Sequence, residues 1–247
     1  MHPSGRPSGP GIGGTIPTDR DWRGHWDGGA PLAEDALAQV GRTVGGRPIS
    51  PEQIDRLTAA IEDALDLRAS DVLADLCCGN GLITVRLARR CAAVVGVDYS
   101  RELIAVARRD YGAGNISYLQ RGAEEIGPRD FPPPGLNKVV MNQGLQYFDE
   151  AMLRRLLTNL EACAGRGMTL FLTDIPDAAR LRAFYDTPER WAEFERRRAA
   201  GQEALGTWWS RDHLRGVLED HGYGVEFRVD DARFTAHYRF DLLATKG

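Results

Sequence analysis

Residues 75–81 read DLCCGNG, between SDVLA (70–74) and LITVRLARR (82–90). The apolar run before them predicts a buried strand, the two glycines predict a tight turn, and residues 82–90 predict a helix. Glycines at such a turn let the main chain approach a ligand that side chains would block. The following helix also presents free N–H groups. The stretch therefore predicts a ligand site at the end of a strand.

The same alternation continues along the chain. Further strands are predicted at residues 92–98, 115–119, 137–142 and 168–174, and helices at 100–110, 149–164 and 210–220. Before them, Ser50 and Gln53 form the capping box of a helix over residues 50–67. Residues 223–245 predict two strands about a turn near Asp230 and Asp231. Strands that alternate with helices indicate an α/β fold with a doubly wound, mostly parallel sheet and helices on both faces.

Composition limits the organisation of the chain. Residues 1–20 are rich in Gly and Pro and predict a disordered tail. Residues 21–247 predict a single domain, in which residues 21–67 and an insertion at 175–210 cover the substrate. The 247 residues carry a net charge of −4, which argues against a nucleic-acid partner. Without a signal-like start or an apolar run of about 20 residues, we expect a cytoplasmic protein with no membrane partner.

Two acidic residues at predicted strand ends narrow the ligand. Asp75 lies four residues before Gly79, and Thr84 stands where a dinucleotide-binding motif has its third glycine. A carboxylate there would repel a pyrophosphate and attract an ammonium. Asp98 ends the next strand, where an acid can accept both hydroxyls of a ribose. A ligand with an ammonium, a ribose and no phosphate fits both acids, and S-adenosylmethionine is such a ligand.

Three segments carry a resemblance to a known family. VLADLCCGNGLIT (72–84), VVGVDYS (94–100) and NISYLQRGAEEI (115–126) resemble the motifs of class I S-adenosylmethionine-dependent methyltransferases, over roughly residues 70–175. QVGRTVGGRPIS (39–50), GTWW (206–209) and HYRFDLL (237–243) are similar to bacterial small-molecule methyltransferases. The resemblance implies a Rossmann-like sheet of seven strands whose last strand is antiparallel. One departure is Asn137-Lys138, where many relatives have an aspartate at the start of the fourth strand.

The resemblance also implies the cofactor site. The methionine end, the ribose, the adenine and the transferable methyl group would be held by Asp75, Cys77, Gly79, Gly81, Asp98, Tyr99, Ala123, Glu124, Asn142 and Gln143. The four cysteines do not have metal-ligand spacing, so we expect no metal.

Residues on the substrate side are predicted from their chemistry. Histidine is the usual base near neutral pH, and His25 and His237 are the catalytic candidates, with His237 placed in a strand. The candidates for binding the acceptor are Gln146, Tyr147, Tyr185, Trp209 and Arg239.

The sequence thus predicts an enzyme of class EC 2.1.1 that methylates a small molecule. A hydroxyl of a sugar or natural-product intermediate is the favoured acceptor, and an amino group is close behind. We also allow for a homodimer. The alternatives are an RNA or protein methyltransferase, a dinucleotide oxidoreductase, and a cofactor-binding module without catalysis.

Overall fold

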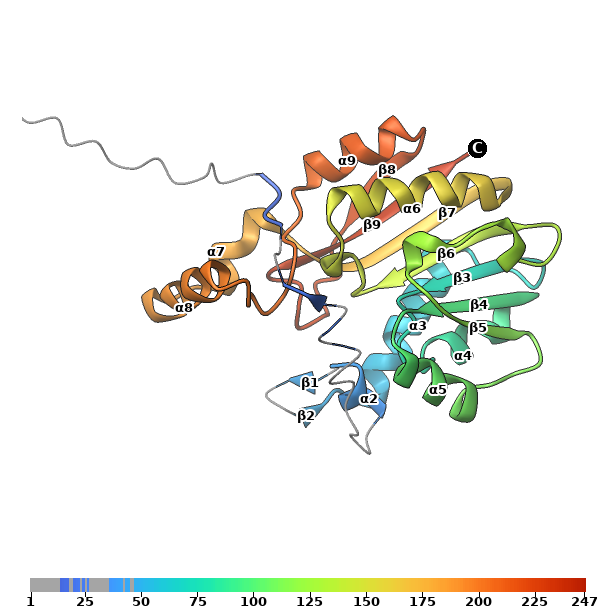
Figure 1. Ribbon diagram of the computed structural model, residues 1–247, viewed down its shortest axis with the longest axis horizontal. Coiled ribbons are helices and arrows are strands. Elements are labelled where there is room, and N and C mark those ends of the chain that lie inside the picture. Colours follow the sequence, from blue (N-terminus) through green and yellow to red (C-terminus); the bar gives the residue numbers. More distant parts are fainter. Residues whose placement is uncertain are drawn as a thin grey trace, which may run out of the picture.

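A seven-stranded sheet forms the centre of the protein (Figure 1). The computed structural model describes residues 14–17, 20–22, 24, 26, 36–41, 43–44 and 47–247, excluding the side chains of 43, 44, 47, 48 and 166. The strands are β3 (Val72–Leu76), β4 (Ala93–Asp98), β5 (Ile116–Gln120), β6 (Leu136–Asn142), β7 (Ala164–Pro176), β8 (Gly224–Arg228) and β9 (Arg239–Lys246). Their order across the sheet is β5-β4-β3-β6-β7-β9-β8.

The direction of the strands confirms the predicted fold class. Strands β3 to β7 pair in parallel, and β9 runs antiparallel to both of its neighbours, β7 and β8. The chain builds outward from β3 to β5 and then returns to place β6 on the other side of β3. Such a reversal leaves a crevice at the carboxyl ends of the strands, where doubly wound proteins bind their ligands.

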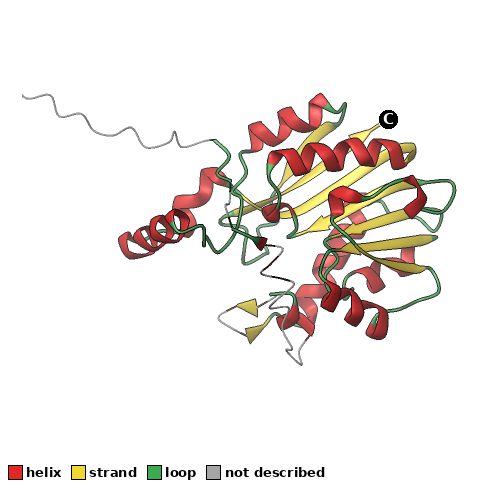
Figure 2. Ribbon diagram, in the orientation of Figure 1, coloured by secondary structure: helices red, strands yellow, loops and turns green. Residues whose placement is uncertain are grey.

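Helices cover both faces of the sheet (Figure 2). One face carries α3 (Pro51–Leu65), α4 (Thr84–Leu87) and α5 (Arg101–Asp110), and the other carries α6 (Glu150–Cys163) and α9 (Arg211–Asp220). Neighbouring residues of a strand point to opposite faces, so Leu73 packs with α3 and α4 while Leu76 packs with α6. Because both faces are covered, every residue of β3 is buried.

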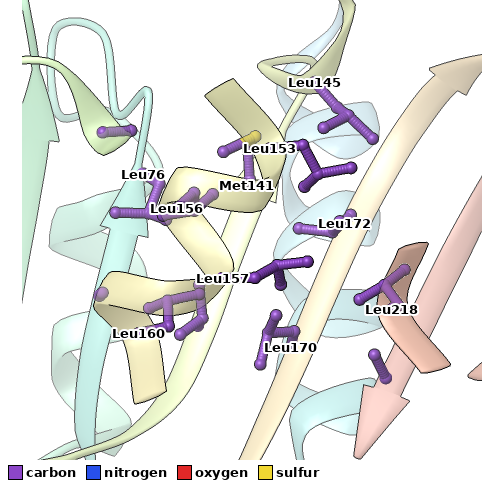
Figure 3. Close-up of a cluster of buried hydrophobic side chains, with 14 of the residues drawn as sticks. Leu76, Met141, Leu145, Leu153, Leu156, Leu157, Leu160, Leu170, Leu172 and Leu218 are labelled. Atoms are coloured by element: carbon purple, nitrogen blue, oxygen red, sulfur yellow. The ribbon is translucent and has the colours of Figure 1, made fainter. Parts of the chain in front are cut away.

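The leucines of α6 show how the sequence positions this layer (Figure 3). Leu153, Leu156, Leu157 and Leu160 recur at helical spacing and are all buried. They pack with Met141 of β6 and with β7 residues in the larger core cluster. Asp149 caps the helix by accepting from Met152 N at 2.7 Å, which fixes where the loop after β6 ends.

The remaining elements lie beyond the carboxyl ends of β3 to β6 (Figure 1). They are α2 (Ala36–Gln39), the β1 (Thr43–Val44) and β2 (Arg47–Pro48) pair, α7 (Leu181–Phe184) and α8 (Pro188–Ala199). Short 3-10 turns are η1 (Ala88–Arg90), η2 (Ala123–Glu125), η3 (Pro128–Asp130), η4 (Leu145–Tyr147) and η5 (Ala178–Arg180). No helix of the described residues is long and apolar enough to cross a membrane.

Part of the segment predicted to be disordered is paired with the domain. Ile16 forms an antiparallel bridge with Trp208, through N–H to O distances of 2.8 and 2.9 Å. Thr15 Oγ1 accepts from Ser210 N at 3.1 Å. These bonds attach residues 15 and 16 to the chain just before α9.

Two predicted details of the chain have different outcomes. Asn137 and Lys138, which replace the aspartate of many relatives, lie at the start of β6, away from the carboxyl ends of the strands. There Asn137 Oδ1 accepts from Val72 N at 2.9 Å, and Lys138 Nζ donates to Leu65 O at 2.6 Å. The turn near Asp230 is wider than predicted, because β8 ends at Arg228 and β9 begins at Arg239. His237 therefore lies in the loop between them, where the sequence predicts a strand.

Replacing Ser50 with alanine should destabilise the protein by about 1 kcal/mol. Ser50 Oγ accepts from Gln53 N at 3.4 Å and Gln53 Oε1 accepts from Ser50 N at 3.0 Å, which completes the predicted capping box. Denaturant unfolding measures the loss. Ser70→Ala, at an exposed turn position, is the control and should change stability by less than about 0.5 kcal/mol. Equal stabilities for the two variants would contradict the assignment.

Candidate functional site

The turn after β3 brings the main chain to the crevice. Cys77, Gly79 and Gly81 all have positive φ, at 56°, 58° and 82°. A Cβ on Gly81 would lie 2.5 Å from Tyr118 Oη, so a side chain there would push the turn away from α5 and β5. Gly81 thus packs against Tyr118, and residues 77–80 line a cavity, here called the central cavity.

Asp98 joins this turn to the end of β4. Its Oδ2 accepts from Gly79 N and its Oδ1 accepts from Ser100 N, both at 2.9 Å. The residue is only 8% exposed, yet it lines the central cavity. Its carboxylate is therefore a fixed hydrogen-bond acceptor at the wall of this cavity.

Asp75 lies deeper than the cavity wall. It is 3% exposed, and its Oδ2 accepts from Thr84 Oγ1 at 2.6 Å. Thr84 occupies the position of the third glycine of a dinucleotide motif, and its hydroxyl links α4 to β3. Among the predicted cofactor residues, Asp75 and Gly81 are the two that do not line the central cavity or the neighbouring rim cavity described below.

The two adjacent thiols of the turn are neutral wall groups. Burial, with the carboxylates of Asp98 and Glu124 nearby, raises the pKa of the Cys77 thiol well above its ordinary value. Burial and Asp75 do the same to the pKa of Cys78. Because only a thiolate is strongly nucleophilic, we assign neither cysteine a covalent role.

Aromatic side chains close the central cavity. Trp26, Tyr99 and Tyr147 line it, and the Tyr99 hydroxyl donates to Trp22 O at 2.9 Å. The rings of Trp22 and Tyr147 are 4.8 Å apart, and those of Trp26 and Tyr147 are 6.1 Å apart. The described part of segment 20–26 therefore lies over this cavity. Val40, beyond α2, completes the wall.

A second opening, here called the rim cavity, adjoins the central cavity. Both are lined by Cys77, Tyr99 and Tyr147, and the rim cavity is further lined by Ala123 and Glu124 of η2. Glu124 is 7% exposed. The three segments that the resemblance implied for a nucleoside ligand therefore meet at the carboxyl ends of β3, β4 and β5.

A third opening, here called the side cavity, lies beside the central cavity. It shares Asn142 and Gln143, at the end of β6, with the central cavity. Its other walls come from α3, from Asp174 of β7 and from residues 232–235 of the β8–β9 loop. Asn142 and Gln143 are therefore wall residues of both cavities.

Asp174 is fixed at the wall of the side cavity. It is 5% exposed, with φ at +63°. Its carboxylate accepts from the Gln143 side-chain amide and from Thr235 Oγ1, the latter at 2.7 Å. Burial alone would raise the pKa of Asp174, but Arg239 and these two hydrogen bonds lower it below its ordinary value. The side chain is therefore a rigid, ionised acceptor.

The predicted acceptor-binding residues divide between walls and core. Tyr147 lines the central and rim cavities, and Gln146 is buried beside it in η4. Tyr185 lies in an aromatic cluster and donates to Glu203 Oε1 at 2.7 Å. Trp209 is fully buried and donates to Leu145 O at 3.0 Å. Arg239 is buried behind Asp174 and donates to its main-chain carbonyl.

Of the two catalytic histidine candidates, only His237 lies among the described residues, and it does not line the site. His25 lies outside the described residues. His237 is exposed, its Nδ1 lies 3.0 Å from Phe234 O, and it lines neither the central nor the side cavity. No described histidine lines either cavity.

Several side-cavity residues were not predicted from the sequence, namely Asp174, Arg233, Phe234 and Thr235. Asp174 had a usable signal, because it ends the predicted strand 168–174, as Asp98 ends an earlier one. The loop residues carry no comparable sequence signal, since the sequence predicts a strand at their positions. Their position depends on Arg233, which donates to Asp230 Oδ2 at 3.1 Å and to Asp241 Oδ2 at 2.7 Å.

Comparison of the sequence with known proteins identifies similar methyltransferases. The family model described as "Methyltransferase domain" matches residues 73–167. The chain is 32% identical over 94 residues to the uncharacterized methyltransferase C70.08c of Schizosaccharomyces pombe, covering 38% of this chain and 35% of that protein. It is 30% identical over 129 residues to a 23S rRNA (uracil(1939)-C(5))-methyltransferase of Edwardsiella ictaluri, covering 47% and 30%. The chain thus spans about a third of these curated relatives.

Solved structures share the fold at low identity. A S-adenosylmethionine-dependent methyltransferase of Leishmania major has a TM-score of 0.64 and 13% identity, covering 91% of this chain and 81% of that one. The magnesium protoporphyrin IX methyltransferase of Synechocystis PCC 6803, with bound S-adenosylhomocysteine, has a TM-score of 0.56 and 18% identity, covering 79% and 83%.

Proposed function

We propose that this chain, whose residues 73–167 form a class I methyltransferase domain, moves a methyl group from S-adenosylmethionine to an oxygen or nitrogen of a small molecule. A sugar or a natural-product intermediate is the expected kind of acceptor. The observation that carries the proposal is that two neighbouring cavities share Asn142 and Gln143 as wall residues. One cavity suits the methyl donor, and the other suits the acceptor.

The residues of the central and rim cavities fit the donor. Asp98 brings a carboxylate to the wall of the central cavity at the end of β4, where an acidic residue can bind ribose hydroxyls. The main chain of residues 77–80 faces the place of the methionine end, and Ala123 and Glu124 face the place of the adenine. When bound, the cofactor supplies a methyl group on a positively charged sulfur. Ring faces attract such cations, and Trp26 and Tyr147 present rings to the central cavity.

What this protein would contribute to the reaction is mainly positioning. Methyl transfer is an in-line displacement, and holding the reactants in line can supply about 7–11 kcal/mol of the barrier. Asn142 and Gln143 lie where the two ligands would meet. The aromatic residues over the central cavity would exclude water from the donor.

RNA is the alternative acceptor, because relatives of this domain include an rRNA methyltransferase. The net charge of −4 gives little support to that alternative. An electrophoretic shift of tRNA that weakens as salt rises would favour it.

The direct test combines binding and transfer. Calorimetry with S-adenosylmethionine, S-adenosylhomocysteine and NAD should show binding of the first two only. The full chain should then be incubated with a cell extract and deuteriomethyl-labelled cofactor, and mass spectrometry should show a labelled small molecule. Binding of NAD alone, or of none of the three, would refute the proposal. Binding without any labelled product would favour a non-catalytic module.

A further inference from the structure

We propose that the side cavity selects an amine as the methyl acceptor, carried on a compact ring or apolar body, with Asp174 as the residue that receives it. This inference rests on the proposed function and decides between the two acceptor atoms that it leaves open. Four features of the cavity support it: the bonding of Asp174, the local charge, an exposed ring, and the bases available.

The first feature is the bonding of the Asp174 carboxylate. Its hydrogen-bond donors are neutral groups, the amide of Gln143 and the hydroxyl of Thr235. Arg239 donates to the main-chain carbonyl of Asp174. The carboxylate oxygens thus keep acceptor positions toward the cavity. Because Gln143 also lines the central cavity, a group bound to Asp174 lies next to the place of the donor methyl.

The second feature is an excess of negative charge. Asp174, Asp230 and Asp241 surround two guanidinium groups, those of Arg233 and Arg239. The guanidinium of Arg233 donates hydrogen bonds to Asp230, Asp241 and Thr173. This network therefore has one carboxylate more than it has cations, and a cation in the cavity would balance it.

The cavity mouth does not reverse this balance. Glu52 and Arg56 of α3 also line the cavity, and both are exposed. Their opposite charges offset each other one helical turn apart. An anionic acceptor would therefore meet Asp174 without a net positive wall to hold it.

The third feature is an exposed aromatic ring. Phe234 is 47% exposed and lines the side cavity with Leu57 and Ala232. An exposed phenylalanine offers a ring or apolar body a surface to pack on, and its face attracts ammonium groups. Together with Asp174, it gives the cavity one apolar wall and one anionic wall.

These features favour methyl transfer to nitrogen, because the positive charge of the donor moves to the acceptor atom during the reaction. The bound ammonium first releases a proton to water, and the lone pair of the resulting neutral amine forms the new N–C bond while the S–C bond of the donor breaks. The sulfonium becomes a thioether, and its positive charge moves to the nitrogen. A proton then leaves the ammonium for water. A fixed carboxylate beside that nitrogen stabilises the arriving charge.

A hydroxyl acceptor is much less acidic than an ammonium and would need a base within the site, and the cavities offer a poor one. No described histidine lines them. The pKa of Asp174 is lowered, as described above, which weakens it as a base. Burial raises the pKa of the Tyr147 phenol, so it stays protonated near neutral pH.

The test measures binding of three probes of one shape to the full chain loaded with S-adenosylhomocysteine, which keeps the probes out of the central cavity. The probes are benzylammonium, benzyl alcohol and benzoate, and saturation-transfer NMR gives their affinities. Benzylammonium should bind about tenfold more tightly than benzyl alcohol, since it gains a charge-assisted hydrogen bond. Benzoate should bind most weakly.

Two variants localise the preference. Asp174→Asn should bring benzylammonium to the level of benzyl alcohol, while Asp63→Asn, at an exposed position of α3 that does not line the side cavity, should preserve the preference. Equal or tighter binding of benzyl alcohol or benzoate by the wild type would overturn the inference, as would failure of all three probes to bind. If Asp174→Asn does not fold, the order of the three probes on the wild type still decides.

The loading step separates the two proposals. Failure to bind S-adenosylhomocysteine would refute the proposed function itself. Binding of S-adenosylhomocysteine without a preference for the amine would refute only the choice of acceptor.

Discussion

Replacing Gly206 with alanine should destabilise the protein by about 2–5 kcal/mol. Gly206 has φ at +84°, and a Cβ there would lie 2.2 Å from Gln146 O. That carbonyl also accepts from Thr207 N at 2.8 Å. The new methyl group must therefore either break this pairing or move η4, which carries Tyr147 to the cavity. Denaturant unfolding measures the loss.

The chain contains a matched control at another glycine. Gly216 lies inside α9, where a Cβ would meet nothing within 4 Å. Gly216→Ala should therefore stabilise the protein by about 0.5–1 kcal/mol, because alanine favours helix. Similar unfolding free energies for Gly206→Ala and Gly216→Ala would show that the close approach at Gln146 does not constrain the fold.

Asp98→Ala should weaken binding of S-adenosylhomocysteine by about 10- to 100-fold, the equivalent of about 1.5–3 kcal/mol. The variant loses the carboxylate that we propose binds the ribose. It also releases Gly79 N, which shapes the wall of the central cavity. Calorimetry measures the affinity, and a thermal melt checks that the variant is folded.

Two further variants sharpen this result. Glu102→Ala removes an exposed acid from the first turn of α5 and should leave the affinity unchanged. Asp98→Asn keeps the shape and should lie between the wild type and Asp98→Ala. An Asp98→Ala protein that is folded and binds as tightly as the wild type would place the ribose elsewhere.

The strands and the donor side of the site could be predicted because their signals are local. Continuous apolar runs mark the buried strands, and Asp98 follows such a run directly. The end of a parallel strand has a fixed place in this fold. The position of Asp98 at the cavity therefore needs no information from distant residues.

The acceptor side depends on contacts that composition does not show. Trp209 and Tyr147 are both aromatic residues near the carboxyl edge, yet Trp209 is enclosed by the core and Tyr147 faces two cavities. Arg239 looks like an anion-binding residue in the sequence, but it is buried and donates to Asp174 O. His237 and Arg239 are two residues apart in the sequence, as side chains on one face of a strand are. In the structure, the ion pairs of Arg233 with Asp230 and Asp241 hold the segment that contains His237 in a loop.

The bridge between Ile16 and Trp208 has a practical consequence for handling this protein. A protease that cuts after residue 16 would leave the amide and carbonyl of Trp208 without these partners. The cut would also remove the pairing close to Gly206, which packs against the main-chain carbonyl of Gln146, the residue before Tyr147. Preparations shortened at the amino end are therefore expected to differ from intact ones in how firmly they retain a nucleoside.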